Sequence, residues 1–151
     1  MSPGAHPSAN TEDLLKASGY RYTLDWPIDD QPVWLSTAAG PLLSVPYPHD
    51  VNDVPMIVLH DGTGSAFADM AIDDLMERLD QSKAQPLVCG ITIHTFIVGQ
   101  PFRIRQFRRV LDALEQIRDK VWVSTAGSIA EHFAERFPAH SANVNTGASY
   151  V

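Results

Sequence analysis

The feature that most constrains the fold is an alternation of short apolar segments with amphipathic helical patterns. A β-branched apolar segment at 87–93 precedes a helical pattern at 102–118, and a shorter one at 121–123 precedes a helical pattern at 128–137. Another helix is predicted at 65–81. Strands that alternate with helices pair in parallel and are covered by the helices. The sequence therefore predicts an α/β fold with a parallel sheet.

The N-terminal part predicts shorter elements. A helix should begin near Thr11, where Glu12 and Asp13 favour its positive end, and should stop at Gly19. Further extended pieces are expected at 20–24, 33–36, 42–45 and 56–59.

Chain length limits how complete this architecture is. The sequence has 151 residues, which fits one domain, predicted over 1–137 and followed by a polar tail at 138–151. Three to four strand–helix units are too few to close an eight-unit barrel, which usually needs roughly 250 residues. Two alternatives remain: a small open α/β domain, or part of a larger barrel.

Composition excludes several classes of function. The net charge of −7 argues against nucleic-acid binding, which needs a basic face for the phosphates. The single cysteine, Cys89, excludes an intrachain disulfide framework. No apolar run approaches the roughly 18 residues of a membrane span, and the first residues show no apolar signal region. We therefore expect a cytoplasmic protein with no nucleic-acid or membrane partner.

His94 is the first candidate for chemistry. It ends the segment at 87–93, and α/β sheets place ligand sites at the carboxyl ends of their strands. Alternation puts Gly90 and His94 on one side of the strand, and Cys89 and Ile91 on the side that a helix would cover. The imidazole would serve as a general acid or base near neutral pH. The alternative is a strand-end histidine hydrogen bonded to backbone.

The second candidate is the acidic segment DWPIDD at 25–30, which also follows a predicted strand. Its carboxylates, Asp25, Asp29 and Asp30, would orient a histidine, hold a cation or bind sugar hydroxyls, and the indole of Trp26 would stack on a sugar ring. The alternative is a turn in which the aspartates cap backbone N–H groups.

Two other patterns carry weaker signals. Four arginines fall within 103–109, but helical spacing does not put all of them on one face, which favours a solvated helix surface over an anion site. The loop pairs His49–Asp50 and His60–Asp61 lack further ligands at metal-binding spacing.

Several blocks of the sequence together resemble the polysaccharide deacetylase (NodB-homology) family, in its allantoinase-like branch. The blocks are SPG at 2–4, NTEDLLKASGYRYTLDWPIDDQPVWL at 10–35, VPYPHDVND at 45–53, GITIHTFIVGQPFRIRQFRRVLDAL at 90–114 and VWVSTAGSIAEHF at 121–133. The DDQP block and the IH-x(4)-GQP-x-R block are fairly specific in combination. Gln100 departs from the usual GRP form of the second block.

The resemblance implies a partial (β/α) barrel of the glycoside hydrolase/deacetylase type, of which this chain would be about the C-terminal half. It implies hydrolysis of amide C–N bonds, in N-acetyl groups of sugars or in a ureide ring. The family's late histidine, an acid toward the leaving group, maps to His94. Its aspartate–tryptophan block, which lines the pocket and orients that histidine, maps to Asp25 and Trp26, with Asp29 or Asp30.

The family's metal-and-base motifs, a TFDDG-like aspartate pair and H-[ST]-x-x-H, do not occur in this sequence. We therefore expect no cofactor in this chain, and a divalent metal such as zinc in a complete protein. The expected function is that of the C-terminal part of a deacetylase-like hydrolase of small amides or N-acetylated sugars, inactive alone, which pairs with an N-terminal half or self-associates. The alternative is a non-catalytic α/β binding or interaction module derived from the same fold.

Overall fold

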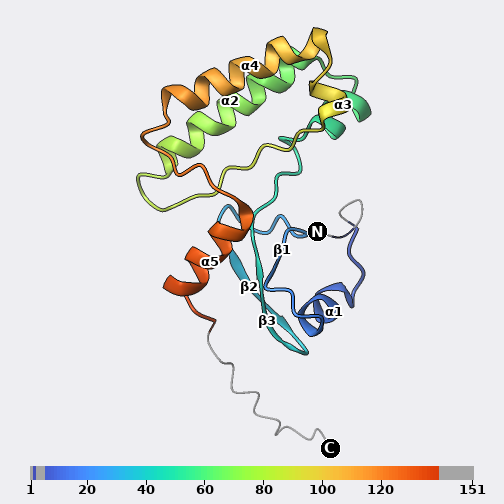
Figure 1. Ribbon diagram of the computed structural model, residues 1–151, viewed down its shortest axis with the longest axis vertical. Helices are drawn as coiled ribbons and strands as arrows, with labels where there is room; N and C mark the ends of the chain where they lie inside the picture. The colour runs from blue at the N-terminus through green and yellow to red at the C-terminus, as the bar shows by residue number, and fades with distance from the viewer. Residues whose placement is uncertain (1, 3–5, 140–151) are drawn as a thin grey trace, which may run out of the picture.

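The computed structural model describes residue 2 and residues 6–139, so most of the predicted tail at 138–151 lies outside the described residues. Figure 1 shows two regions along the long axis: α2, α3 and α4 at one end, and the sheet with α1 and α5 at the other. The elements in chain order are α1 (Thr11–Ala17), β1 (Tyr22–Thr23), β2 (Val33–Thr37), β3 (Gly40–Ser44), the π-helix η2 (Val54–Leu59), α2 (Gly64–Gln81), α3 (Thr95–Val98), α4 (Pro101–Gln116) and α5 (Ala126–Arg136).

The sheet has three strands in the order β1-β3-β2, and its pairing is mixed. β1 runs parallel to β3, with Tyr22 opposite Leu43, whereas β2 runs antiparallel to β3, with Trp34 opposite Leu43. The prediction of a wholly parallel sheet is therefore wrong here. The reason is the two-residue connection between Thr37 and Gly40, because so short a turn joins only antiparallel strands.

The three long helices lie close to their predicted positions because local signals define their ends. The Thr63 hydroxyl accepts the Ala66 N–H (3.0 Å) at the start of α2, and Thr125 accepts the Ser128 N–H (3.2 Å) at the start of α5. Pro101 occupies the first turn of α4, where its missing N–H costs nothing. The helices predicted at 65–81, 102–118 and 128–137 are thus confirmed within about two residues.

The core is divided between the two regions. In the helical region, Phe67 and Ala71 of α2 and Val110 of α4 are buried, and Ile91 packs against them from the extended segment. In the sheet region, Leu43 and Val45 pack against Ala130 of α5, with Tyr22, Leu24, Trp34, Ala126, Ile129 and Phe133 around them. The side of 87–93 that carries Ile91 therefore faces the helices, as alternation predicts.

Three predicted strands take other forms. Residues 56–59 lie in η2, and 121–123 have no strand partner in the described part of the chain. Residues 87–93 are extended but form only the isolated parallel bridge between Thr92 and Asn52. A strand is defined by a run of hydrogen bonds to a neighbour, so an apolar segment with a single bridge or with no partner does not become one. A closed barrel is therefore not seen in the described residues.

None of the helices in the described part of the chain combines the length and the hydropathy that a membrane crossing requires.

Candidate functional site

The side chain of His94 is held by a buried aspartate. Its Nδ1 lies 2.6 Å from Oδ1 of Asp53, and its backbone N–H donates to Oδ2 of the same carboxylate at 2.7 Å. Asp53 is completely buried, whereas the imidazole is 37% exposed. One carboxylate therefore fixes both the ring and the backbone of His94, and the ring remains accessible from solvent.

Two neighbouring segments bring this pair together. The Thr92 N–H donates to the carbonyl of Val51 (2.9 Å), and the Asp53 N–H donates to the carbonyl of Thr92 (3.2 Å), around the bridge with Asn52. Because the segments run parallel, residues that follow the bridge on each side lie next to one another. Asp53 then leads into η2 and His94 into α3. The two residues are 41 positions apart in the sequence and are brought together by this register.

The arrangement suits proton transfer. With Nδ1 engaged by Asp53, the other ring nitrogen, Nε2, has no hydrogen-bond partner among the described residues. A histidine whose Nδ1–H donates to a carboxylate has a fixed tautomer and orientation, and its Nε2 is left to accept or donate a proton. The imidazole of His94 has the geometry of an oriented general acid or base.

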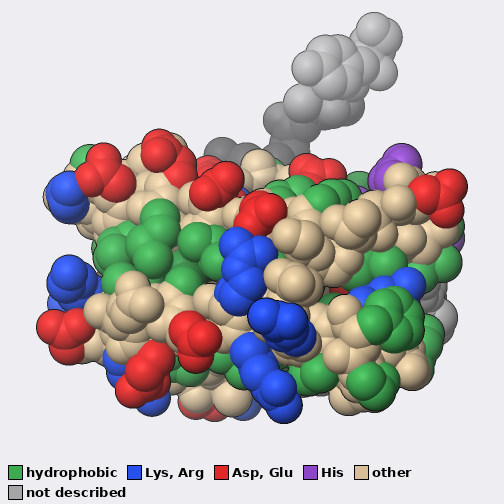
Figure 2. Space-filling model, turned by 90° about the horizontal axis from the view of Figure 1, so that it is seen from above, with side chains coloured by type: hydrophobic (Ala, Val, Ile, Leu, Met, Phe, Trp, Pro, Cys, Tyr) green, Lys and Arg blue, Asp and Glu red, His purple; other side chains and the backbone are tan. Residues whose placement is uncertain are grey.

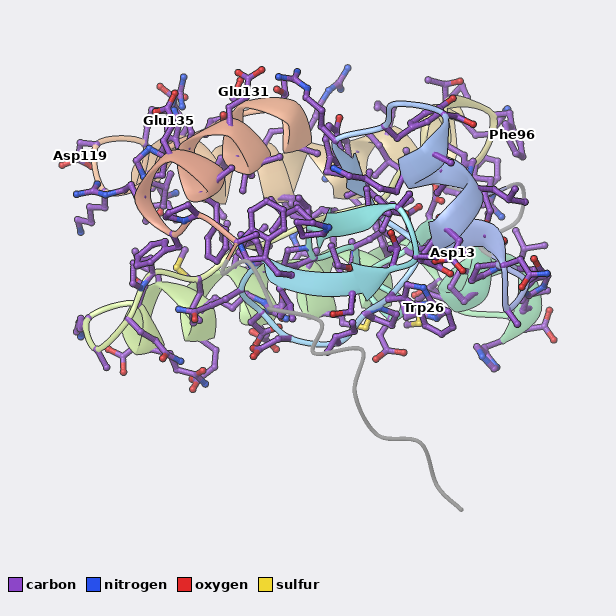
Figure 3. All side chains as sticks on the ribbon, turned by 90° about the horizontal axis from the view of Figure 1, so that it is seen from below. Asp13, Trp26, Phe96, Asp119, Glu131 and Glu135 are labelled. Atoms are coloured by element: carbon purple, nitrogen blue, oxygen red, sulfur yellow. The ribbon has the colours of Figure 1, made fainter. Side chains whose placement is uncertain are left out.

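The exposed ring of Phe96 lies beside the imidazole of His94. The two rings meet edge to face, with centroids 5.6 Å apart, and 69% of Phe96 is exposed. In Figure 3 its side chain lies at the outer edge of the molecule. A group that approached His94 from solvent would pass next to this ring.

Asp25 is a second buried carboxylate, with different partners. Its oxygens accept from the Thr23 hydroxyl (2.7 Å) and from the backbone N–H and hydroxyl of Ser2 (2.6 and 2.8 Å). Burial opposes ionisation, but these hydrogen bonds outweigh it and lower the pKa of Asp25 below its ordinary value. Asp25 is therefore an ionised group that ties residue 2 to the end of β1.

Trp26 is turned toward α1. Its indole N–H donates to Oε1 of Glu12 at 2.5 Å, and 41% of the residue is exposed. Figure 3 labels Trp26 on the side of the molecule where Asp13 of α1 is also labelled. The hydrogen bond with Glu12 fixes one edge of the indole, so any stacking on a sugar ring would use its exposed surface.

Asp29 and Asp30 line an open cleft of about 460 Å³. Its walls are residues 27–30 and 46–51 together with Asp74, Arg78, Val88 and Gly90. The Arg78 guanidinium lies between two carboxylates, with Nη1 2.5 Å from Asp30 and Nε 2.9 Å from Asp74. Although burial opposes the charge, these carboxylates raise the pKa of Arg78 above its ordinary value. This ion pair fastens the loop that carries Asp30 to α2.

The orienting role expected for the segment at 25–30 is therefore corrected. The carboxylate bonded to His94 is Asp53, not Asp25, Asp29 or Asp30, which have the partners just described. The sequence holds one signal for Asp53, which ends the block VPYPHDVND. The structure adds that this block is bridged in parallel to the segment that carries His94. Substrate binding by the segment at 25–30 stays a prediction.

The two sides of the segment at 87–93 differ as alternation predicts. The Cys89 thiol lies 3.4 Å from Asp74 of α2, and burial together with this carboxylate raises its pKa to about 12. On the opposite side, a Cβ added at Gly90 would lie only 2.7 Å from the ring of Pro48. Glycine at 90 thus permits the close approach of the two segments that carry His94 and Asp53.

The remaining candidates do not join the site. Arg109 pairs with Asp69, and the Arg103 guanidinium lies over the ring of Phe102. Figure 2 shows Lys and Arg side chains gathered across the middle of the helical end, among acidic neighbours, as expected for a solvated surface. In residues 6–139 no group of three or more His, Cys, Asp or Glu side chains is placed to hold a metal ion.

Comparison with known proteins supports the resemblance stated above. No family model and no curated protein matches the chain. Solved structures do match. A protein described as a polysaccharide deacetylase from Pseudomonas aeruginosa PAO1 is 28% identical, with a TM-score of 0.75, and the match covers 88% of this chain and 45% of that one. The Puue allantoinase is 26% identical, with a TM-score of 0.78, and the match covers 89% of this chain and 45% of that one.

A third structure shares the fold. It is described as a polysaccharide deacetylase from Mycobacterium smegmatis, is 22% identical with a TM-score of 0.70, and the match covers 89% of this chain and 48% of that one. The resemblance to polysaccharide deacetylases and an allantoinase is thus confirmed over nearly nine-tenths of the chain. The chain spans less than half the length of each of these structures.

Proposed function

We propose that this chain is the C-terminal part of a polysaccharide-deacetylase-like hydrolase of non-peptide C–N bonds in amides, in which His94 is the proton donor to the leaving amine. The observation that carries the proposal is the buried Asp53 carboxylate bonded to a solvent-accessible imidazole. The likeness to a deacetylase and an allantoinase, both hydrolases of C–N bonds by name, supports the reaction class.

The proposed step uses the residues of this chain as follows. When the C–N bond of a tetrahedral intermediate breaks, the leaving nitrogen needs a proton, and Nε2 of protonated His94 supplies it. Asp53 keeps the ring oriented and compensates its positive charge before the transfer. After the transfer the imidazole is neutral, with Nδ1–H still donated to Asp53.

Formation of that intermediate is assigned to residues outside this chain. The described residues contain no group of three or more metal-ligating side chains, so they do not fit the divalent metal that the family resemblance implies. We derive no step through a metal. Because groups that act as one catalytic unit fail together, the chain alone is expected to be inactive on N-acetylglucosamine oligomers and on allantoin.

The neighbours support a class of substrate. We propose a small amide, either an N-acetyl group on a sugar or a ureide ring, because the matched structures carry the names deacetylase and allantoinase. The exposed surface of Trp26 and the carboxylates of Asp29 and Asp30 are proposed to contact sugar hydroxyls or ureide N–H groups.

A chimera tests the proposal. Residues 2–137 would replace the matched portion of the Pseudomonas aeruginosa deacetylase, and release of acetate or of ureide product would be measured. The expected result is turnover that His94→Ala lowers by about 10²–10⁴-fold, the usual contribution of a general acid. Asp53→Asn is also expected to lower kcat, because the amide offers one acceptor oxygen where the carboxylate accepts from both Nδ1–H and the backbone N–H of His94.

His60→Gln is the matched control, since His60 is exposed in a loop and is expected to leave kcat unchanged. An active chimera that is indifferent to His94→Ala would overturn the role of His94. A folded chimera without turnover would contradict the hydrolase proposal and favour the non-catalytic binding module. Turnover by the 151-residue chain alone that His94→Ala abolishes would show a complete site of another kind.

A further inference from the structure

The outer face of α4 carries charges of opposite sign in its two halves. Arg105 and Arg108 lie in the N-terminal half, Asp112 and Glu115 lie in the C-terminal half, and all four residues are exposed. Their spacing of three, four and three positions places them in one row along the helix. This row lies opposite the side that buries Val110. We call these four charged residues the charge stripe.

The arrangement of the charge stripe is unfavourable within a single helix. Residues three positions apart are neighbours on a helix surface, so Arg105 repels Arg108 and Asp112 repels Glu115. The helix dipole favours acidic residues in the first turn and basic residues in the last turn, and α4 has neither. No side chain of the charge stripe forms an ion pair with another residue in the described part of the chain.

The charge stripe is complementary to a second copy of itself. When two α4 helices lie antiparallel with their Val110 positions at the same level, Arg105 of one faces Glu115 of the other. At that level Arg108 faces Asp112 of the second copy. A two-fold axis repeats both contacts, which gives four pairs of opposite charge. A parallel arrangement would place each residue next to its own copy, and every pair would then repel.

The surroundings of the charge stripe permit such a contact. Figure 1 shows α4 at the end of the molecule that lies away from the sheet, α1 and α5. Leu111 is 48% exposed and lies next to the centre of the charge stripe, so antiparallel pairing brings it close to Leu111 of the second copy. Figure 2 shows hydrophobic side chains among the charged ones at this end. Apolar contact therefore adds to the charge pairing.

We propose that the charge stripe is the interface of a homodimer, in which two copies of α4 pack antiparallel about a two-fold axis. Exposed ion pairs contribute little each and are screened by salt, so the dimer is weak and forms at high protein concentration and low ionic strength. The contact uses the outer surface of a helix, and it is independent of both the proposed reaction at His94 and the unpaired segment at 121–123.

Sedimentation equilibrium of the complete 151-residue chain tests the proposal first. The expected result is a monomer–dimer equilibrium whose dissociation constant rises at least about tenfold between about 20 mM and about 300 mM sodium chloride. The rise follows from the screening of four exposed charge pairs.

Two double variants test the pairing itself. Arg105→Glu with Arg108→Glu makes the charge stripe wholly acidic, and Asp112→Arg with Glu115→Arg makes it wholly basic. Each double variant alone should be monomeric, because like charges would meet at the interface. An equimolar mixture of the two should form a heterodimer whose dissociation constant lies within about tenfold of that of the unsubstituted homodimer.

The matched control is Glu131→Arg with Glu135→Arg, which changes the net charge by the same amount as the basic double variant. Figure 3 labels both residues on α5, and Figure 1 shows α5 at the other end of the molecule from α4. This control should change the dissociation constant of the homodimer by less than about threefold.

Four results would overturn the proposal. The first is a chain that stays monomeric at about 1 mM protein and low salt, beyond the range of a weak dimer. The second is a dimer that both double variants still form alone, which would place the interface elsewhere. The third is a mixture of the two double variants that stays monomeric. The fourth is a monomeric chain whose arginines bind an anionic polymer such as heparin, which would make that polymer the occupant.

Discussion

The paired helices α2 and α4 differ from the segments at 87–93 and 121–124 in where their backbone hydrogen bonds are made. Each helix satisfies its hydrogen bonds within itself, and the two bury Phe67, Ala71 and Val110 between them and their neighbours. The segment at 87–93 is joined to other backbone only by bonds to Asp30, Val51 and Asp53, and among the described residues no backbone hydrogen bond involves 121–124. A helix is complete when it folds, whereas a strand requires a neighbour.

The difference matters because the candidate site lies at the boundary between the two kinds of segment. His94 follows an extended segment and begins α3, and Asp53 follows another and begins η2. Ile91 packs the segment before His94 against the helices. The parallel bridge between Thr92 and Asn52 sets the register of that segment relative to the one that carries Asp53.

The largest expected effect contrasts the two kinds of segment directly. Phe67→Ala should lower the free energy of unfolding by about 3–5 kcal/mol, because the ring is 1% exposed in the helical core. Trp122→Ala removes a larger ring, yet it should cost less than about 1 kcal/mol, since most of Trp122 is exposed. Urea denaturation of both variants checks this. Equal losses would show that 121–124 is packed as a core strand.

A smaller effect is expected from the ion pair that joins α2 to the loop at 25–30. Arg78→Met leaves Asp74 and Asp30 without their cation and should cost about 1–3 kcal/mol, less than a fully buried pair because Asp30 is half exposed. The control is Arg109→Met, which breaks the exposed pair with Asp69 and should cost at most about 1 kcal/mol. If chemical denaturation gave the two variants similar losses in the free energy of unfolding, Arg78 would not hold the loop at 25–30 to α2.

The third prediction concerns acid stability in the sheet region. Because the folded pKa of Asp25 lies below its ordinary value of 3.8, its contribution is complete above pH 3.8 and is lost as the pH falls further. Asp25→Asn should therefore lower the free energy of unfolding by about 1–2 kcal/mol at pH 7. The difference in stability between the variant and the unsubstituted chain should disappear as Asp25 becomes protonated in acid. Unfolding curves between pH 7 and pH 2 measure this difference, because the predicted loss begins only below pH 3.8. A gap that stays constant with pH would refute an ionised Asp25.

The smallest expected effect is on the reactivity of Cys89, which lies on the helix-facing side of 87–93. Cys89 has a pKa of about 12, so little reactive thiolate exists at pH 8. Alkylation by iodoacetamide should be at least about tenfold slower than in the urea-unfolded chain, and its rate should still rise above pH 10. A folded rate equal to the unfolded one, or a plateau near pH 9, would place Cys89 outside the contact with Asp74.

The sequence predicts the helices well because their signals are local. Thr63, Thr125 and Pro101 mark helix starts through residues only a few positions away, and the apolar spacing marks the buried faces. The side of the strand that holds Cys89 is predicted for the same reason, since alternation is a local property.

The remainder depends on contacts that sequence spacing does not contain. The choice of Asp53 over Asp25 as the partner of His94 is set by the register at Thr92, between segments about 40 positions apart. Likewise, an apolar run such as 121–123 has strand propensity in any context, but whether it becomes a strand is decided by its neighbour. The antiparallel pair of β2 and β3 can be predicted from local sequence, because a two-residue turn places the second strand directly beside the first.

Hydrogen exchange of the 151-residue chain, resolved by residue, is the most direct test of the comparison. It asks whether the amides of α2 and α4 are hydrogen bonded while those of 121–124 have no partner. The account predicts that the central amides of α2 and α4 exchange slowly, with protection that approaches the global free energy of unfolding, while the amides of 121–124 exchange near the rate of an unfolded peptide. Protection of 121–124 as strong as that of α4, in a chain shown to be monomeric, would mean that this segment is already paired and would contradict the account.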